Sequence, residues 1–265
     1  MNIIEGLIQL KNLETYYTEN YSEEVRLHRS QAHSIEFSTT MKFLLEYLPE
    51  GCNVLDCCAG AGVYAFPLAR HGYQVTAGDL VEKHVEIMKQ ADKDALLTHI
   101  YQGDVLDMSK FEDQSFDAVI CMGALYHLMS EKEREACIAE CLRVLKNGGI
   151  LALAYINRNA MYIAQLSDDN YSVENANKIL DSGINRVFYG MNFGEMDELT
   201  NKFSLEKMTD IGVDGLVYPL FDRLNELSET EFADYLAYHL STCQQSSILG
   251  HSCHGLWIGK KYSAS

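Results

Sequence analysis

Two aspartates and two closely spaced glycines are the residues whose types and spacing most directly suggest chemistry. Asp56 ends a short apolar run and is followed by a loop of small residues that contains Gly60 and Gly62. Asp79 ends the next apolar run, nineteen residues after Gly60. Together with Ala65, the loop fits the fingerprint that lets a backbone approach a nucleotide-like ligand, and Asp79 then lies where an acidic residue binds ribose hydroxyls.

The charge of Asp56 narrows the choice of ligand. A carboxylate at the mouth of the loop repels a pyrophosphate but attracts a cation, and no Lys-Ser or Lys-Thr pair follows the glycines to form a phosphate-binding loop. S-adenosylmethionine carries a sulfonium and an ammonium group and no phosphate. The loop therefore favours S-adenosylmethionine over NAD, and an NAD-dependent oxidoreductase stays open as the alternative.

A histidine after the fourth predicted strand is the candidate for acid–base chemistry. His127 follows the apolar run 116–122, and Tyr126 beside it is expected to line a substrate pocket. Histidine is suited to accept a proton at neutral pH, so we predict that His127 is the general base for a hydroxyl or ammonium acceptor. A purely structural histidine, hydrogen-bonded within the loop, is the alternative.

Side chains that can bind metals gather near the end of the chain: His239, Cys243, His251, Cys253 and His254. Structural zinc sites use such ligands, but the spacing matches no familiar zinc pattern. We therefore predict no metal site. The segment is expected to pack near the last strand, with His254 or Ser252 facing the pocket.

Strands and helices alternate along the part of the chain that carries these residues. Apolar runs predict strands at 54–55, 73–77, 99–102, 116–122 and 150–156, and helical patterns lie at 64–70, 81–90 and 130–147. Two further strands are predicted at 203–211 and 255–259, with a helix at 229–242. This order predicts an α/β fold with a doubly wound, mostly parallel, seven-stranded sheet, whose ligands bind beyond the carboxyl ends of the strands.

A single domain is predicted over residues 1–265, because no linker or repeat interrupts the chain. Residues 49–156 form the cofactor-binding core and residues 201–265 complete the sheet. Helical spacing predicts a helical cover over residues 1–48, and the long polar segment 157–200 predicts a lid insertion. Residues 1–48 have two possible roles. They either cover the sheet without contacting the substrate, which is the simpler interpretation, or bind the substrate as well. The candidate substrate residues are Tyr17, Tyr21, Arg29, His33, Tyr126, Tyr155 and His254.

The sequence resembles the class I S-adenosylmethionine-dependent methyltransferases over most of this core. Five motifs carry the resemblance in the family's order: residues 54–62, Asp79, Gly103-Asp104-Val105, residues 116–120 and residues 142–150. The resemblance implies a Rossmann-like methyltransferase fold, S-adenosylmethionine as the methyl donor and S-adenosylhomocysteine as the product. One departure is Cys58, which stands where the family usually has its first glycine.

The resemblance also implies which residues bind the cofactor. Asp79 corresponds to the acidic residue that holds the ribose hydroxyls, and Asp104 to the one beside the adenine amino group. The full set is Asp56, Ala59, Gly60, Gly62, Asp79, Leu80, Gly103, Asp104, Val105 and Met122. Because methyl transfer from a sulfonium is an in-line displacement, the protein needs mainly to position the acceptor and exclude water.

Composition limits the acceptor and the location. The net charge of −17 repels nucleic acid and anionic membranes, so we predict a small-molecule acceptor. Eight cysteines at irregular spacings indicate reduced thiols in the cytoplasm, and neither a signal peptide nor a membrane span is expected. A non-catalytic module that binds S-adenosylmethionine or a partner protein is the remaining alternative.

Overall fold

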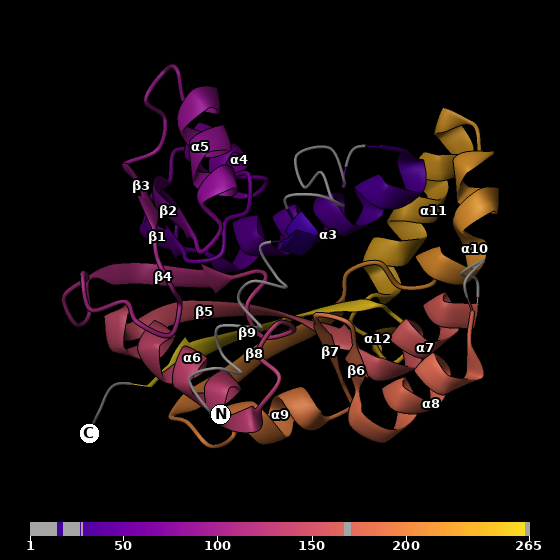
Figure 1. Cartoon of the computed structure of the whole chain (residues 1–265). Helices are drawn as coiled ribbons and strands as arrows, with labels where there is room; N and C mark the ends of the chain where they lie inside the picture. Colours follow the sequence, from indigo (N-terminus) through magenta and orange to yellow (C-terminus); the bar gives the residue numbers. More distant parts are fainter. Residues whose placement is uncertain (1–14, 18–26, 28, 167–170, 263–265) are drawn as a thin grey trace.

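The computed structural model describes residues 15–17, 27, 29–166 and 171–262, and a mostly parallel β-sheet lies at its centre (Figure 1). Within these residues the sheet has nine strands, and seven of them lie in the order β3-β2-β1-β4-β5-β9-β8, with β9 antiparallel to both neighbours. Their bounds are β1 Asn53–Asp56, β2 Gln74–Asp79, β3 His99–Gln102, β4 Phe116–Cys121, β5 Leu145–Asn157, β8 Leu205–Gly212 and β9 His254–Lys261. The predicted doubly wound fold is confirmed.

Helices cover both faces of this sheet (Figure 1). The helices with described bounds are α3 Gln31–Tyr47, α4 Ala65–Arg70, α5 Glu82–Ala91, α6 Glu131–Val144, α7 Arg158–Leu166, α8 Val173–Ser182, α9 Glu195–Thr200, α10 Val217–Asn225, α11 Glu229–Thr242 and α12 Ser246–Leu249. The predicted start of α6 is confirmed, since Ser130 and Glu133 form a reciprocal capping box that satisfies backbone N–H groups of the first turn.

Two hydrophobic cores lie on opposite faces of the sheet. Helices α3, α4 and α5 pack against one face, which includes Val54 and Ile120, and α6 and α9 pack against the other, which includes Leu55 and Val119. Successive side chains of a strand point to opposite faces. Each central strand is therefore buried on both sides, which explains its continuous apolar sequence.

The strand β5 begins earlier than the sequence suggested. Leu145, directly after α6, is already extended, with φ −80° and ψ 131°, and it pairs with Phe116 before the register shifts. The predicted helix end near Gly148 is therefore wrong. Gly148 has φ +76° and lies within this irregularity of the strand, where glycine adopts the left-handed conformation without steric cost.

The segment 157–200 folds as α7, α8, a short hairpin and α9. The hairpin consists of β6 (Ile184–Asn185) and β7 (Phe188–Met191), which were not predicted. Strand β7 also pairs in parallel with the end of β5, where Ile156 lies opposite Gly190. The insertion is therefore attached to the carboxyl end of a central strand, the edge at which ligands bind in this fold.

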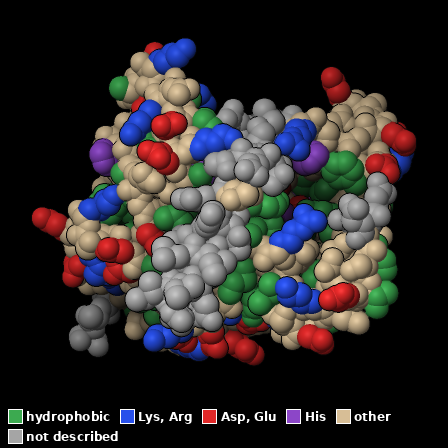
Figure 2. Space-filling view, in the orientation of Figure 1, with side chains coloured by type: hydrophobic (Ala, Val, Ile, Leu, Met, Phe, Trp, Pro, Cys, Tyr) green, Lys and Arg blue, Asp and Glu red, His purple; other side chains and the backbone are tan. Residues whose placement is uncertain are grey.

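The described part of the N-terminal segment packs against the C-terminal half of the chain. Ala32 and Ile35 of α3 form a small core with Val217 and Leu224 of α10, a helix that was not predicted. On the face shown in Figure 2, hydrophobic side chains gather around the middle of the molecule and acidic side chains lie mostly nearer its rim. Within the described ranges, every helix is too short or too polar to cross a membrane.

Candidate active site

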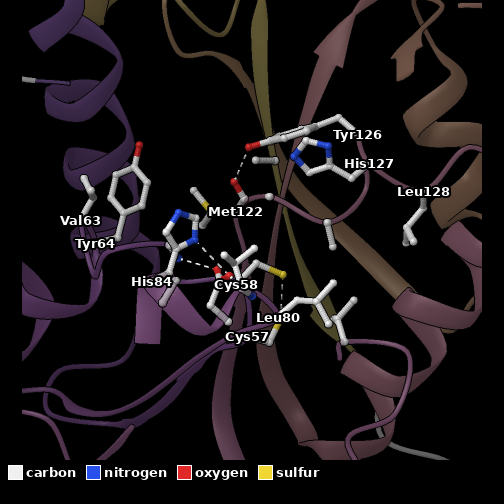
Figure 3. Close-up of a pocket in the computed structure, with 18 of the residues that line it drawn as sticks. Cys57, Cys58, Val63, Tyr64, Leu80, His84, Met122, Tyr126, His127 and Leu128 are labelled. Carbon is white, nitrogen blue, oxygen red and sulfur yellow. Dashed lines mark hydrogen bonds and ion pairs between the residues drawn. The ribbon is translucent and has the colours of Figure 1, made fainter. Parts of the chain in front are cut away.

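A cavity of about 350 Å³ lies at the carboxyl ends of β1, β2, β3 and β4. Parallel strands bring the loops that follow them to one edge of the sheet. Figure 3 shows the loop after β1, Leu80 after β2 and Met122 after β4 around this cavity. Of the ten residues implied to bind the cofactor, eight line it: Ala59, Gly60, Asp79, Leu80, Gly103, Asp104, Val105 and Met122.

Asp79 holds the glycine loop in place. Its Oδ2 atom accepts a hydrogen bond from the backbone N–H of Gly60 at 2.8 Å, and its Oδ1 atom accepts one from the N–H of Val81 at 2.9 Å. The Nδ1 atom of His84 lies 3.1 Å from the same Oδ1 atom (Figure 3). One carboxylate therefore connects the loops after β1 and β2 and also lines the cavity.

Gly62 shapes the loop and does not line the cavity. Its φ is +87°, and a Cβ atom at this position would lie 2.6 Å from the ring of Phe66. Only glycine meets both conditions without strain. The expected contact of Gly62 with the cofactor is therefore replaced by a role in the turn that presents Gly60.

Asp56 lies behind the loop and does not make the contact expected of it. The residue is fully buried and is not part of the cavity wall, and among the described residues neither carboxyl oxygen has a hydrogen-bond partner. Burial raises the pKa of Asp56 well above its usual range, which favours the neutral carboxyl. The attraction of Asp56 for a cation, which was expected from the sequence, therefore has no support in this arrangement.

The lining of the cavity nevertheless suits S-adenosylmethionine. The carboxyl groups of Asp79 and Asp104 lie on it together with the apolar side chains of Leu80, Val105 and Met122. None of the described residues that line it is Lys or Arg. The wall therefore offers negative charge to a sulfonium or ammonium group and no cation to a pyrophosphate, so it fits S-adenosylmethionine better than NAD.

A second cavity of about 430 Å³ adjoins the first, because Tyr17, Glu36, Tyr126 and His254 line both. Its walls come from α3, α7, α10, the β6–β7 hairpin and the start of β9. Six of the described lining residues are aromatic: Tyr16, Tyr17, Tyr126, Phe188, Tyr218 and Phe221. A molecule in this second cavity would lie beside one in the first.

Four of the expected substrate residues belong to the N-terminal segment: Tyr17, Tyr21, Arg29 and His33. Arg29 and His33 line the second cavity, and the ring of His33 meets that of Phe221 edge to face at 5.0 Å. Tyr17 lines both cavities. Tyr21 lies outside the described residues. The N-terminal segment therefore contributes to the wall of the second cavity.

His127 lies on the wall of the first cavity, beside Tyr126 (Figure 3). Its Nδ1 atom lies 2.9 Å from the carbonyl oxygen of Val187. A carbonyl only accepts, so the ring proton lies on Nδ1, and Nε2 accepts a hydrogen bond from the Tyr17 hydroxyl at 2.9 Å. Burial lowers the pKa of His127 to about 4, so the ring is neutral at pH 7. The position of His127 on the cavity wall agrees with the predicted base. Its hydrogen bond to the Val187 carbonyl agrees with the alternative, a structural histidine.

Tyr155 lies on the opposite face of the sheet, so its expected substrate contact is wrong. Its neighbours Ala154 and Ile156 line the first and second cavities, and alternation along β5 turns Tyr155 away from both. Its hydroxyl donates to Oδ1 of Asp210 at 2.9 Å. Alternation groups Tyr155 with one face of β5, but the strand is apolar on both faces, so its sequence did not indicate which face meets the cavities.

The five metal-capable residues near the end of the chain do not gather at one point, and Cys243 is buried with its Sγ atom against the carbonyl oxygen of Leu240. His239 is buried with Nε2 against the carbonyl oxygen of Val213 at 3.2 Å, and His251 is exposed. Cys253 and His254 instead lie together with Asp214, and their ligand atoms are within 4.8 Å of one another. His254 lines both cavities, as predicted for a residue that faces the pocket.

Two acidic residues of the second cavity, Asp214 and Glu36, were missed. Asp214 follows β8 in the same way that Asp79 ends β2, so the rule of an acidic residue after a strand could have found it. Glu36 lies within α3, and no local pattern distinguishes it from a solvent-exposed glutamate. Its role depends on the packing of that helix over the cavities.

Comparison with known proteins identifies the family of this chain. A family model described as a methyltransferase domain matches residues 55–153. A ubiquinone biosynthesis O-methyltransferase from Xanthomonas oryzae is 30% identical over 189 residues, which cover 71% of this chain and 75% of that protein. A protein of the same name from Methylocella silvestris is 32% identical over 109 residues, which cover 41% of each. The chain belongs to the class I S-adenosylmethionine-dependent methyltransferases, and S-adenosylmethionine is its cofactor.

Solved structures share the fold. An S-adenosylmethionine-dependent methyltransferase from Methanosarcina mazei superposes with a TM-score of 0.59 at 20% identity, over 84% of this chain and 98% of that one. A Thermotoga maritima methyltransferase, described as a possible histamine N-methyltransferase, has a TM-score of 0.59 at 17% identity, over 95% of this chain and 99% of that one. At these identities the likeness concerns the fold alone.

Proposed function

We propose that this methyltransferase acts on a small molecule that binds in the second cavity. The observation that carries the proposal is the shared wall of Tyr17, Glu36, Tyr126 and His254. A cofactor in the first cavity and an acceptor in the second would meet at this wall. Such an arrangement converts methyl transfer into a reaction between two positioned groups.

The lining of the second cavity favours an acceptor with a flat apolar part. Aromatic side chains from four separate segments surround it, including Phe188 of the hairpin and Phe221 of α10. Aromatic rings pack favourably edge to face or offset against other rings. The relatives named as O-methyltransferases support a hydroxyl oxygen as the methyl acceptor. We therefore infer an acceptor that carries a hydroxyl group on or near a ring.

Each expected contact with the cofactor is part of this proposal. Asp79 would hold the ribose hydroxyls and Asp104 would lie beside the adenine, while Gly60 lets the backbone approach the ligand. When bound, S-adenosylmethionine supplies a methyl group that is already activated by its sulfonium. The task of the protein is then to orient the acceptor and exclude water.

His127 remains a candidate for the base, but its contacts favour a positioning role. The lone pair of Nε2 is directed at the Tyr17 hydroxyl, and a group with a pKa of about 4 accepts a proton weakly at neutral pH. We propose that the pair of Tyr17 and His127 fixes the boundary between the two cavities. A base for the acceptor is then needed elsewhere in the wall.

The domain organisation separates the part of the chain that binds the cofactor from the parts that enclose the acceptor. We propose that residues 1–265 form one methyltransferase domain, in which residues 49–156 bind the cofactor and residues 201–265 complete the sheet. The cover 1–48 and the insertion 157–200 would enclose the acceptor, because Arg29 and His33 from the first and Phe188 from the second line the second cavity.

Calorimetry and an acceptor screen test the proposal. S-adenosylmethionine and S-adenosylhomocysteine should bind and NAD should not, and methyl-labelled S-adenosylmethionine should label a phenol or catechol in a panel of hydroxyl, amine and thiol compounds. Tight binding of NAD without binding of S-adenosylhomocysteine would support the oxidoreductase alternative. Binding without turnover across the whole panel would support the non-catalytic alternative.

A further inference from the structure

His254 and Asp214, which belong to different segments of the chain, contact each other in the wall between the two cavities. Asp214 follows β8 and is 3% exposed, and His254 begins β9. The Nδ1 atom of His254 lies 2.7 Å from Oδ2 of Asp214. Both residues line the second cavity, and His254 lines the first as well.

Several hydrogen bonds hold Asp214 in one orientation. Its Oδ1 atom accepts from the hydroxyl of Ser252 and from the backbone N–H of His254, the latter at 3.1 Å. Ser252 is itself fully buried, and its oxygen accepts from the backbone N–H of Gly215 at 2.8 Å. The carboxylate is therefore fixed before any ligand binds, and it fixes the ring that contacts it.

This contact determines where the proton lies on the histidine ring. A carboxylate only accepts hydrogen bonds, so Nδ1 of His254 donates to Asp214, and the lone pair of the neutral ring lies on Nε2. A histidine oriented in this way by a buried carboxylate is the usual arrangement of a general base. The tautomer, the orienting partner and the position between two ligand cavities occur together here.

We propose that His254, oriented by Asp214, is the general base that accepts the proton of the acceptor hydroxyl. The inference rests on the proposed function, because it assumes an acceptor in the second cavity. His254 is the catalytic residue and Asp214 is a positioning residue. His127 then serves the wall of the cofactor cavity and is not the base.

Methyl transfer and proton transfer belong to one step. A lone pair of the acceptor oxygen forms the new bond to the methyl carbon, the electron pair of the carbon–sulfur bond stays on sulfur, and the hydroxyl proton moves to Nε2 of His254. The ring becomes an imidazolium that later releases the proton to solvent. Because the sulfonium charge is neutralised as the imidazolium charge forms, the total charge in the two cavities does not change.

The acidic surroundings of His254 favour this proton transfer. Asp214 contacts the ring directly, and Oε2 of Glu36 lies 3.6 Å from Nδ1. Opposite charges within this distance stabilise a protonated histidine. Other titratable groups near the site are the Cys253 thiol beside the ring and the Tyr218 hydroxyl, which interacts with Cys253. Tyr235 and His239 also lie close enough to interact with the charge of Asp214.

His127 instead contacts two neutral groups, the Val187 carbonyl and the Tyr17 hydroxyl, and burial lowers its pKa to about 4. These differences distinguish the two histidines.

The first experiment measures turnover with methyl-labelled S-adenosylmethionine and catechol, 4-nitrophenol or 4-methoxyphenol as acceptor. His254→Asn should lower kcat by 100-fold or more, within the roughly 10²–10⁴-fold that general base catalysis contributes, and change the affinity for S-adenosylhomocysteine far less, although His254 lines that cavity too. His251→Asn is the matched control, because His251 is exposed and lies outside both cavities; it should behave as wild type.

Two further readouts separate a base from a structural histidine. Added imidazole should restore part of the turnover of His254→Gly, and the acidic limb of the wild-type pH–rate profile should be absent from His254→Asn. The loss should also be smallest for 4-nitrophenol, the most acidic of the three acceptors, because its proton needs least help to leave. Equal losses for all three acceptors without imidazole rescue would overturn the proposal.

A measurement without turnover keeps the inference separate from the proposed function. Nitrogen NMR of the histidine rings in the intact chain should show His254 protonated on Nδ1, and Asp214→Asn should change that tautomer. A proton on Nε2 would overturn the inference whatever the acceptor. If no compound is methylated but the tautomer is as expected, the proposed function fails and the dyad stands. Activity lost on chelation with EDTA and restored by Zn²⁺ would instead make Asp214, Cys253 and His254 a metal site.

Discussion

Replacing Asp79 by alanine tests the cofactor site most directly, because one carboxylate holds the glycine loop and faces the cavity. The variant loses the hydrogen-bond acceptor of the Gly60 and Val81 backbone N–H groups. It also removes a carboxylate from the wall that we assign to the ribose. Weaker ligand binding and lower stability should therefore appear together.

The contacts set the size of both effects. A hydrogen bond to a charged group contributes about 1.5–3 kcal/mol. Loss of one such bond to the ligand corresponds to about 10- to 100-fold weaker binding, because about 1.4 kcal/mol is a factor of ten. Loss of the two bonds to the loop lowers the free energy of unfolding by about 3 kcal/mol, since water entering the opened loop replaces part of each bond.

Calorimetry with S-adenosylhomocysteine and urea denaturation measure the two quantities. Asp117→Ala is a matched control, because Asp117 also accepts a backbone N–H, that of Asn53 at 3.0 Å, but at the amino end of β1 and β4. That variant should lose stability and keep its affinity for the ligand. If Asp79→Ala binds S-adenosylhomocysteine as tightly as the wild-type chain, the assignment of the cavity is refuted.

Three further predictions concern the glycine loop, the cavity boundary and the far face of the sheet. Gly62→Ala should lower the free energy of unfolding by about 1–2 kcal/mol, because φ of +87° is unfavourable for alanine; an unchanged urea midpoint would contradict the role in the turn. The pKa of His127 is about 4 in the folded chain and about 6.5 in an unfolded one, so as the pH falls the unfolded state takes up the proton first. The native state should then lose about 2–3 kcal/mol between pH 6.5 and 4, and His127→Gln should lose less in urea titrations across that range; identical pH curves would argue against a buried neutral ring. Tyr155→Phe should lose about 1 kcal/mol of stability with its hydrogen bond to Asp210, and its turnover should equal that of wild type, whereas a marked fall in turnover would return Tyr155 to the site.

The residues of the cofactor cavity were largely predictable because they follow local rules. Asp79 ends a strand and Asp104 follows one, and parallel strands carry such positions to one edge of the sheet. The capping box of Ser130 and Glu133 was predictable for the same reason, since it depends on residues three apart. Each of these features requires only knowledge of where one element begins or ends.

Predictions failed where the outcome depended on how deeply a side chain is buried or on which face of the sheet it lies. Asp56 has the sequence of a ligand contact, but the loop after it folds over its carboxyl group and buries it. Tyr155 lies in a strand that is apolar on both faces, so its neighbours gave no contrast from which to infer its direction. The end of α6 moved because Leu145 gains a strand partner in Phe116, which local helical propensity does not include.

The amino-acid sequence by itself identified eight of the residues that line the proposed cofactor cavity, because strand ends, spaced glycines and acidic residues are local features that the parallel sheet gathers at one edge. Only the tertiary structure decided which residues line the second cavity, where we propose that the acceptor binds. Glu36 lies 178 residues before Asp214 and 218 residues before His254 in the sequence. The three residues meet because α3 packs against α10 while β9 pairs with β8. The spacing of these residues in the sequence does not predict that they come together, since this depends on how distant elements pack.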